Sequence, residues 1–210
     1  HAQGSVMVWA GGGSRRTGDY DPPHATVENS KTRLSTGRAG VGYGGDRLFA
    51  SGGFTIEDGR YGVPFAGKFH AHEDEEVDAP EEEVFLDLST RRRVGRFDVG
   101  MRNLDTPALD SFQVVLNVID WNHDEIEIDE GRETIGTTFD NRTYILRADL
   151  NQRQTDRLSG RFGVWSQFRN YAAIGNEALA PPTEQTSFAA FAHEELTFGR
   201  YRVQLGGRVE

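Results

Sequence analysis

The sequence predicts an all-β fold built from antiparallel strands. Two observations carry this prediction: apolar and polar side chains alternate with a period of two, and helix signals are weak. For example, Gln113 lies between Phe112 and Val114, and Leu116 continues the apolar series two residues later. A period of two places alternate side chains on opposite faces of a strand. Only residues 189–196 have helical character, and no helix-length amphipathic stripe surrounds them.

The alternation recurs in about nine segments, several of them longer than the usual five or six residues of a strand. The segment 84–102 changes phase, because Leu86 and Leu88 are even-numbered whereas Phe97 and Val99 are odd-numbered. We therefore expect a β-bulge near residues 91–94. The expected strands are roughly 4–10, 32–43, 47–56, 84–102, 109–121, 137–153, 157–169, 187–197 and 201–210.

Short and long connections alternate along the chain, and the long ones hold most of the prolines and much of the acidic charge. Long two-faced strands with short turns at one end and long loops at the other are typical of a transmembrane β-barrel of the bacterial outer membrane. The expected short connections are 44–46, 103–108, 154–156 and 199–200, and the long ones are 11–30, 57–83, 122–136 and 170–186. Expected interfacial aromatics are Tyr61, Trp121, Phe139, Phe168, Tyr171 and Tyr201.

The size of the chain predicts a partial barrel. The 210 residues supply about nine strands, whereas a barrel of about 22 strands with a plugged lumen needs roughly 500 residues at this spacing. The chain starts at His1 without an initiator Met, so we expect a processed chain or a fragment. A soluble antiparallel β-sandwich with one face on a core also fits the alternation and stays open here.

Composition excludes several classes of function. The sequence has no cysteine, which excludes disulfides, iron–sulfur clusters, thiol nucleophiles and Cys-ligated zinc. A net charge of −10 argues against nucleic acid as a partner. A mean hydropathy of −0.60 agrees with strands whose other face lines a wet lumen. No nucleophile-elbow pattern is present, and we expect neither an enzyme nor a bound cofactor.

Six strings stand out along the chain: 59–64 (Gly-Arg-Tyr-Gly-Val-Pro), 121–127 (Trp-Asn-His-Asp-Glu-Ile-Glu), 135–141 (Ile-Gly-Thr-Thr-Phe-Asp-Asn), 158–164 (Leu-Ser-Gly-Arg-Phe-Gly-Val), 173–183 and 205–210 (Leu-Gly-Gly-Arg-Val-Glu). In this order they resemble the N-terminal part of the barrel of TonB-dependent outer-membrane receptors, most specifically from Tyr61 onward. The Tyr-Gly-Val-Pro element followed by a His-rich loop is similar to receptors that import zinc.

The resemblance implies an organisation and a function. Residues 1–210 would be one partial barrel domain, with the plug, the TonB box and the C-terminal strands lying outside it. The parent protein would import a scarce metal ion, zinc first, or a metal chelate such as a siderophore, using TonB as energy-transducing partner and lipid as surroundings. An outer-membrane adhesin or a soluble carbohydrate-binding β-sandwich, neither with a transport role, is the alternative.

The sharpest local feature is a His/acidic loop that begins at Phe69. Imidazole and carboxylate groups are zinc ligands, and in an extended segment His70 and His72 point the same way. A solvated charged loop at the barrel mouth is the plainer interpretation and stays open. The expected ligands for a transported Zn²⁺ are His70, His72, Glu73, Asp74 and Glu75, with His123 from the end of the fifth expected strand.

Several arginines alternate along the expected strands: Arg91, Arg93, Arg147, Arg161 and Arg169. If they face the lumen, they either line a path for anionic chelates or pair with acidic side chains inside the barrel. His193 is expected on the same lumen-facing side as Phe191 and Glu195.

Overall fold

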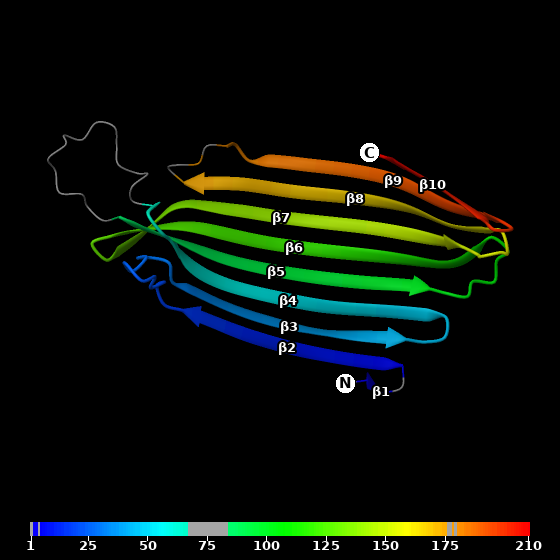
Figure 1. Cartoon of the computed structure of the whole chain (residues 1–210), viewed down its shortest axis with the longest axis horizontal. Helices are drawn as coiled ribbons and strands as arrows, with labels where there is room; N and C mark the ends of the chain where they lie inside the picture. Colours follow the sequence, from blue (N-terminus) through cyan, green and yellow to red (C-terminus); the bar gives the residue numbers. More distant parts are fainter. Residues whose placement is uncertain (1, 4, 67–83, 176–177, 179) are drawn as a thin grey trace.

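The chain forms one antiparallel sheet of ten strands that follow one another in space as in sequence (Figure 1). The computed structural model describes residues 2–3, 5–66, 84–175, 178 and 180–210. The strands are β1 (Ala2–Gln3), β2 (Val6–Thr17), β3 (Thr32–Gly44), β4 (Leu48–Val63), β5 (Phe85–Met101), β6 (Leu109–Asp129), β7 (Arg132–Gln152), β8 (Leu158–Gly175), β9 (Thr183–Phe198) and β10 (Tyr201–Val209). This confirms the all-β antiparallel prediction; β1, a two-residue strand, was not expected.

The sheet is open. The β1 end and β10 lie at its two edges, and no pairing joins them among the described residues. Figure 1 shows the strands running side by side as one curved layer, with the amino and carboxyl ends on opposite edges. None of the described residues forms a helix that is long and apolar enough to cross a membrane.

Short connections gather at one end of the sheet and longer ones at the other (Figure 1). The four expected short connections are present, but the expected long connection 122–136 is wrong. There β6 and β7, each 21 residues long, continue to a tight hairpin. Glu130 and Gly131 take positive φ angles of 46° and 79°, the geometry of a two-residue hairpin turn. Likewise, β2 runs through the three glycines expected to begin the first long loop.

The expected β-bulge in β5 is absent. The pairing of β5 runs without a register shift, from Val63↔Leu86 on the β4 side and from Phe85↔Ile128 on the β6 side. The apparent change of phase has another cause: Leu86 and Leu88 lie near the long-loop end of the sheet, on the opposite face from Phe97. The shifts that do occur lie in the β6–β7 pairing, between Leu109 and Ser111 and between Glu125 and Ile126.

The register places apolar side chains on one face, which we call the apolar face. Directly opposed residues share a face, and the row Val41, Gly52, Phe97 and Leu116 continues across neighbouring strands in this way. Exposed large side chains of this face include Val6, Val8, Val41, Tyr43, Leu48, Phe54, Phe97, Val99, Tyr144, Leu146, Leu150, Phe162, Val164, Phe168, Phe188, Val203, Leu205 and Val209.

The apolar face has nothing packed on it among the described residues. Val164 is 56% exposed and Phe188 is 62% exposed, although both lie in the interior of the sheet. Water-facing apolar patches of this extent are rare on soluble monomers and mark a surface that is covered in use. The buried apolar side chains of the described chain are few: Ala66, Val115, Ile126, Ala173 and Ala189.

The expected aromatic girdle is only partly right. Phe168 and Tyr201 lie on the apolar face, where Phe168 is paired with Tyr144 and Tyr201 with Phe198. Phe168 also meets Phe188 edge-on, with ring centroids 5.7 Å apart. The other expected members lie on the opposite face, because their parity in the register differs: Tyr61, Trp121, Phe139 and Tyr171.

Candidate functional site

We call the other side of the sheet the polar face. Polar and charged side chains alternate there with the apolar face, and several are tied to one another. Asp149 on β7, only 3% exposed, accepts from Arg147 Nε at 2.9 Å and from Arg161 Nε at 3.1 Å. One carboxylate is thus shared by two guanidiniums from adjacent strands through charge-assisted hydrogen bonds, and it offsets part of their positive charge.

The five arginines predicted to face one side are divided between the two faces. Arg147, Arg161 and Arg169 lie on the polar face, as expected. Arg91 and Arg93 do not: the register of β5 puts them on the same side as Phe97, where Arg91 binds Asp58 at 3.0 Å. On the polar face, Arg147 and Arg161 have the expected acidic partner. His193 lies directly opposite Arg161, on the face expected for it.

An aromatic cluster occupies the polar face near the long loops. Its rings belong to Trp121, His123, Phe139 and Tyr171, contributed by β6, β7 and β8. Successive ring centroids lie 5.5, 5.8 and 6.4 Å apart along this row. The indole Nε1 of Trp121 donates to Thr90 Oγ1 at 2.8 Å. We call this group the mouth cluster.

Arg169 extends the mouth cluster toward β9. Its guanidinium lies 5.2 Å from the ring centroid of Tyr171, and its Nε donates to Asn141 Oδ1 at 3.0 Å. Arg169 and Tyr171 also line a shallow hollow with Thr183 and Gln185. Flat rings beside a guanidinium give a surface suited to stacking against a planar or anionic group.

His123 is the only expected metal ligand within the described residues. It sits in the mouth cluster between Trp121 and Phe139, and its Nε2 is buried with no hydrogen-bond partner there. No group of three His, Asp or Glu side chains that could hold a metal ion is found in the described part of the chain. The other expected ligands, His70, His72, Glu73, Asp74 and Glu75, lie outside the described residues.

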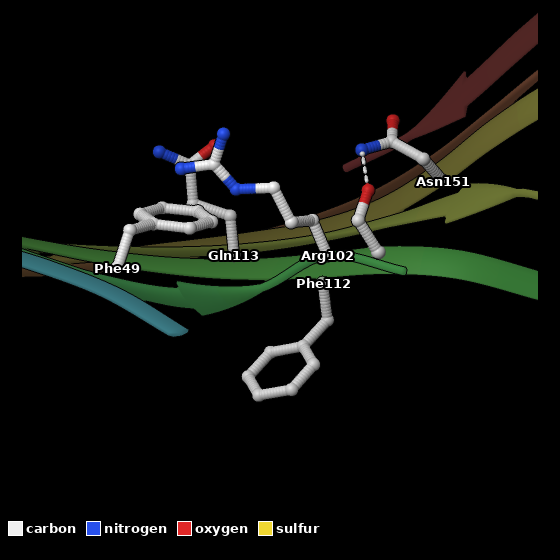
Figure 2. A pocket seen from close by; sticks show the side chains of 6 residues that line it. Phe49, Arg102, Phe112, Gln113 and Asn151 are labelled. Carbon is white, nitrogen blue, oxygen red and sulfur yellow. Dashed lines mark hydrogen bonds between the residues drawn. The ribbon is translucent and has the colours of Figure 1, made fainter. Parts of the chain in front are cut away.

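A second hollow lies at the short-turn end of the polar face (Figure 2). Arg102 stacks over the Phe49 ring at 5.1 Å from its centroid, and Asn151 Nδ2 donates to Ser111 Oγ at 2.9 Å. Figure 2 shows Phe112 pointing away from the other side chains, toward the apolar face. Gln113 Nε2 donates to Asp98 Oδ2 at 2.7 Å. The side chains of this hollow are thus held by contacts between neighbouring strands.

The sequence alone did not predict that Asp149 binds two arginines or that the rings of the mouth cluster lie together. Asp149 has an Arg two residues before it, which is a local signal, but its second partner comes from β8. Trp121 and Phe139, expected among the interfacial aromatics, lie beside His123 on the polar face. Only the cross-strand register brings these residues together.

Comparison with known proteins gives a likeness of structure but none of sequence. No family model matches the chain, and no curated protein matches it either. Among solved structures, the copper transporter OprC is similar with a TM-score of 0.47 at 12% sequence identity, over 96% of this chain. The matched region spans 40% of the length of that transporter. The all-β architecture rests on the pairing of this chain's own strands.

Proposed function

We propose that this chain is part of the β-barrel of a bacterial outer-membrane, TonB-dependent receptor that imports a scarce metal ion or metal chelate, with zinc favoured. One observation carries the proposal: a single long-stranded sheet has a continuous exposed apolar face and an ion-paired polar face. Such a sheet is incomplete in water, and lipid on one side with a polar lumen on the other would satisfy both faces.

Strand length supports a membrane setting. About 9–11 residues tilted near 45° cross a bilayer, and the strands β2 to β9 are 12 to 21 residues long. The excess lies toward the long loops, where the apolar face gives way to charged pairs. Asp120 there accepts from Arg142 Nη2 at 2.7 Å. Charges placed beyond the apolar band avoid the cost of burying them in hydrocarbon.

The proposed activity is binding and translocation without a covalent step. Long loops would capture the substrate, and the mouth cluster would lie on its way into the lumen. Imidazole and carboxylate side chains of the 67–83 loop, with His123, are the proposed zinc ligands. Energy would come from TonB acting on a plug domain supplied by the parent protein.

Cell fractionation of the full gene product tests the membrane part of the proposal. We expect the protein in the outer-membrane fraction, and an upstream coding segment that encodes a plug and a TonB box. Recovery in the soluble pool would favour the β-sandwich alternative instead. A signal peptide that leads directly into His1 would exclude the receptor.

Calorimetric titration with Zn²⁺ tests the substrate. The intact receptor should bind Zn²⁺, and the double variant His70→Ala/His72→Ala should bind it at least about tenfold more weakly, since two imidazole ligands are lost. His24→Ala, in the first long loop, is the matched control and should leave affinity unchanged. Unchanged affinity and unchanged zinc-limited growth in the double variant would refute the zinc assignment.

A further inference from the structure

Three arginines lie side by side at the long-loop end of the apolar face. The register pairs Arg16 of β2 with Arg33 of β3, and Arg33 with Arg60 of β4. Adjacent strands are separated by about 4.8 Å, and like charges placed directly opposite one another repel. We call Arg16, Arg33 and Arg60 the arginine row.

Within the described residues, only Arg60 of the row has acidic partners. Arg60 donates from Nε to Asp87 Oδ2 at 2.7 Å and from Nη2 to Glu133 Oε1 at 2.8 Å. Arg16 and Arg33 are exposed, and neither has a hydrogen-bond or ion-pair partner among the described residues. Asp19 Oδ1 accepts from the backbone N–H groups of Ser30 and Lys31, and no ion pair joins Asp19 to either arginine among the described residues. Within the described part of the chain, two adjacent guanidiniums therefore remain available to an anion.

The row lies about one membrane thickness from Tyr43, near the short-turn end of the apolar face. From Tyr43 to Arg33, ten residue steps of β3 rise about 26 Å at a tilt near 40°. The apolar band of outer-membrane barrels is about 25 Å tall. With the long loops outward, as in the proposed function, Arg16 and Arg33 reach the headgroup level of the outer leaflet.

We propose that Arg16 and Arg33 bind the phosphate groups of an anionic outer-leaflet glycolipid. The inference rests on the proposed membrane setting. Guanidinium groups match phosphate oxygens with paired, charge-assisted hydrogen bonds, and basic residues at the headgroup level recognise anionic lipids. An anion bridging the two groups also removes their mutual repulsion. Their alkyl stems lie along the edge of the apolar face, where the lipid chains begin.

The intact protein, purified from outer membranes and placed in nanodiscs, provides the test. Discs contain either lipid A carrying its phosphates or the dephosphorylated form. We expect wild-type protein to retain the phosphorylated form, and Arg16→Gln/Arg33→Gln to bind it about tenfold more weakly. The matched control is Arg15→Gln/Arg38→Gln, which removes the same charge from the polar face of the same two strands.

Three outcomes would overturn the proposal. Equal retention of the two lipid forms by wild-type protein does so without any variant, even if the double variant fails to fold. Equal lipid binding by the two double variants does so as well. Saturable binding of inorganic phosphate to Arg16 and Arg33 with no preference for phosphorylated lipid would show a free anion as the occupant. If the protein is located in the outer membrane and gives any of these results, the proposed lipid site is refuted, whereas the proposed receptor function is not.

Discussion

At the scale of single residues, the contacts of Asp149 and Glu133 show how differently two carboxylates of this sheet are held. Asp149 is almost fully buried between Arg147 and Arg161. Glu133 is an exposed partner of Arg60 at the long-loop end. The contacts of Asp149 should matter for stability, whereas the contact of Glu133 with Arg60 should matter mainly for acid sensitivity.

Replacing Asp149 should destabilise the folded protein. Asp149→Ala leaves two guanidiniums without their shared carboxylate, and we expect a loss of about 1–3 kcal/mol. The loss should stay below that of a fully buried pair, because both arginines are nearly half exposed. The measurement is urea unfolding of the intact protein in lipid vesicles.

The control for this variant is Asp58→Ala, which removes the exposed partner of Arg91. We expect a change of about 0–1 kcal/mol there. Equal losses in the two variants would show that burial between two arginines adds nothing to the Asp149 contact.

The pair of Glu133 and Arg60 should make the β6–β7 hairpin sensitive to acid. Hydrogen bonding from Arg60 holds the pKa of Glu133 below its ordinary value. The stabilisation is therefore complete above the unfolded-state pKa and disappears as the pH falls through the lower folded-state pKa. Thermal unfolding at neutral and at acid pH should show a smaller acid-induced loss in Glu133→Gln than in wild type. Glu130→Gln, in the adjacent turn, should keep the wild-type loss.

At the scale of elements, each strand has two faces with different surroundings. On β8, Val164 points to the apolar face and Gln167 to the polar face, because their sequence positions differ by an odd number. The two positions lie three residues apart on one strand, a rise of about 10 Å, and they pair with different residues of β7 and β9. Substitutions at these two sites therefore test the assignment of faces directly.

Introducing the same charge on the two faces should have unequal effects. Val164→Arg should destabilise the protein in vesicles by about 2–4 kcal/mol, the cost of a cation on the lipid side near the bilayer midplane. Gln167→Arg should change stability by no more than about 0.5 kcal/mol. Equal effects of the two substitutions would argue that the apolar face does not contact lipid.

At the scale of the whole molecule, the open sheet has two unsatisfied edges. The outer edge of β10 and that of β2 beyond its short pairing with β1 expose backbone groups that further strands would pair, and the apolar face adjoins both. Exposed edges of long strands are templates for association. The 210-residue chain by itself thus combines two features that favour aggregation in water.

We expect the isolated chain to aggregate without a membrane or added strands. Light scattering after dilution from urea should rise in buffer and stay low in detergent micelles, which cover the apolar face. The full gene product in the same detergent is the control and should remain dispersed. An isolated chain that stays monomeric in detergent-free buffer would favour a covered, soluble sheet.

The sequence by itself determined the all-β class, the approximate strand positions and the short-turn end. These depend on local alternation and turn residues, which can be read along the chain. It also placed Phe168 and Tyr201 on the apolar side of the strands and His193 on the polar face.

Only the tertiary structure decided which side chains are neighbours. Register is a relation between strands, and a one-residue difference in parity moves a side chain to the other face. That is why Trp121, Phe139 and Tyr171 join His123 rather than lipid, and why β5 runs without a bulge. The arginine row has the same origin, because Arg16, Arg33 and Arg60 are far apart in sequence and meet only through the pairing of β2, β3 and β4.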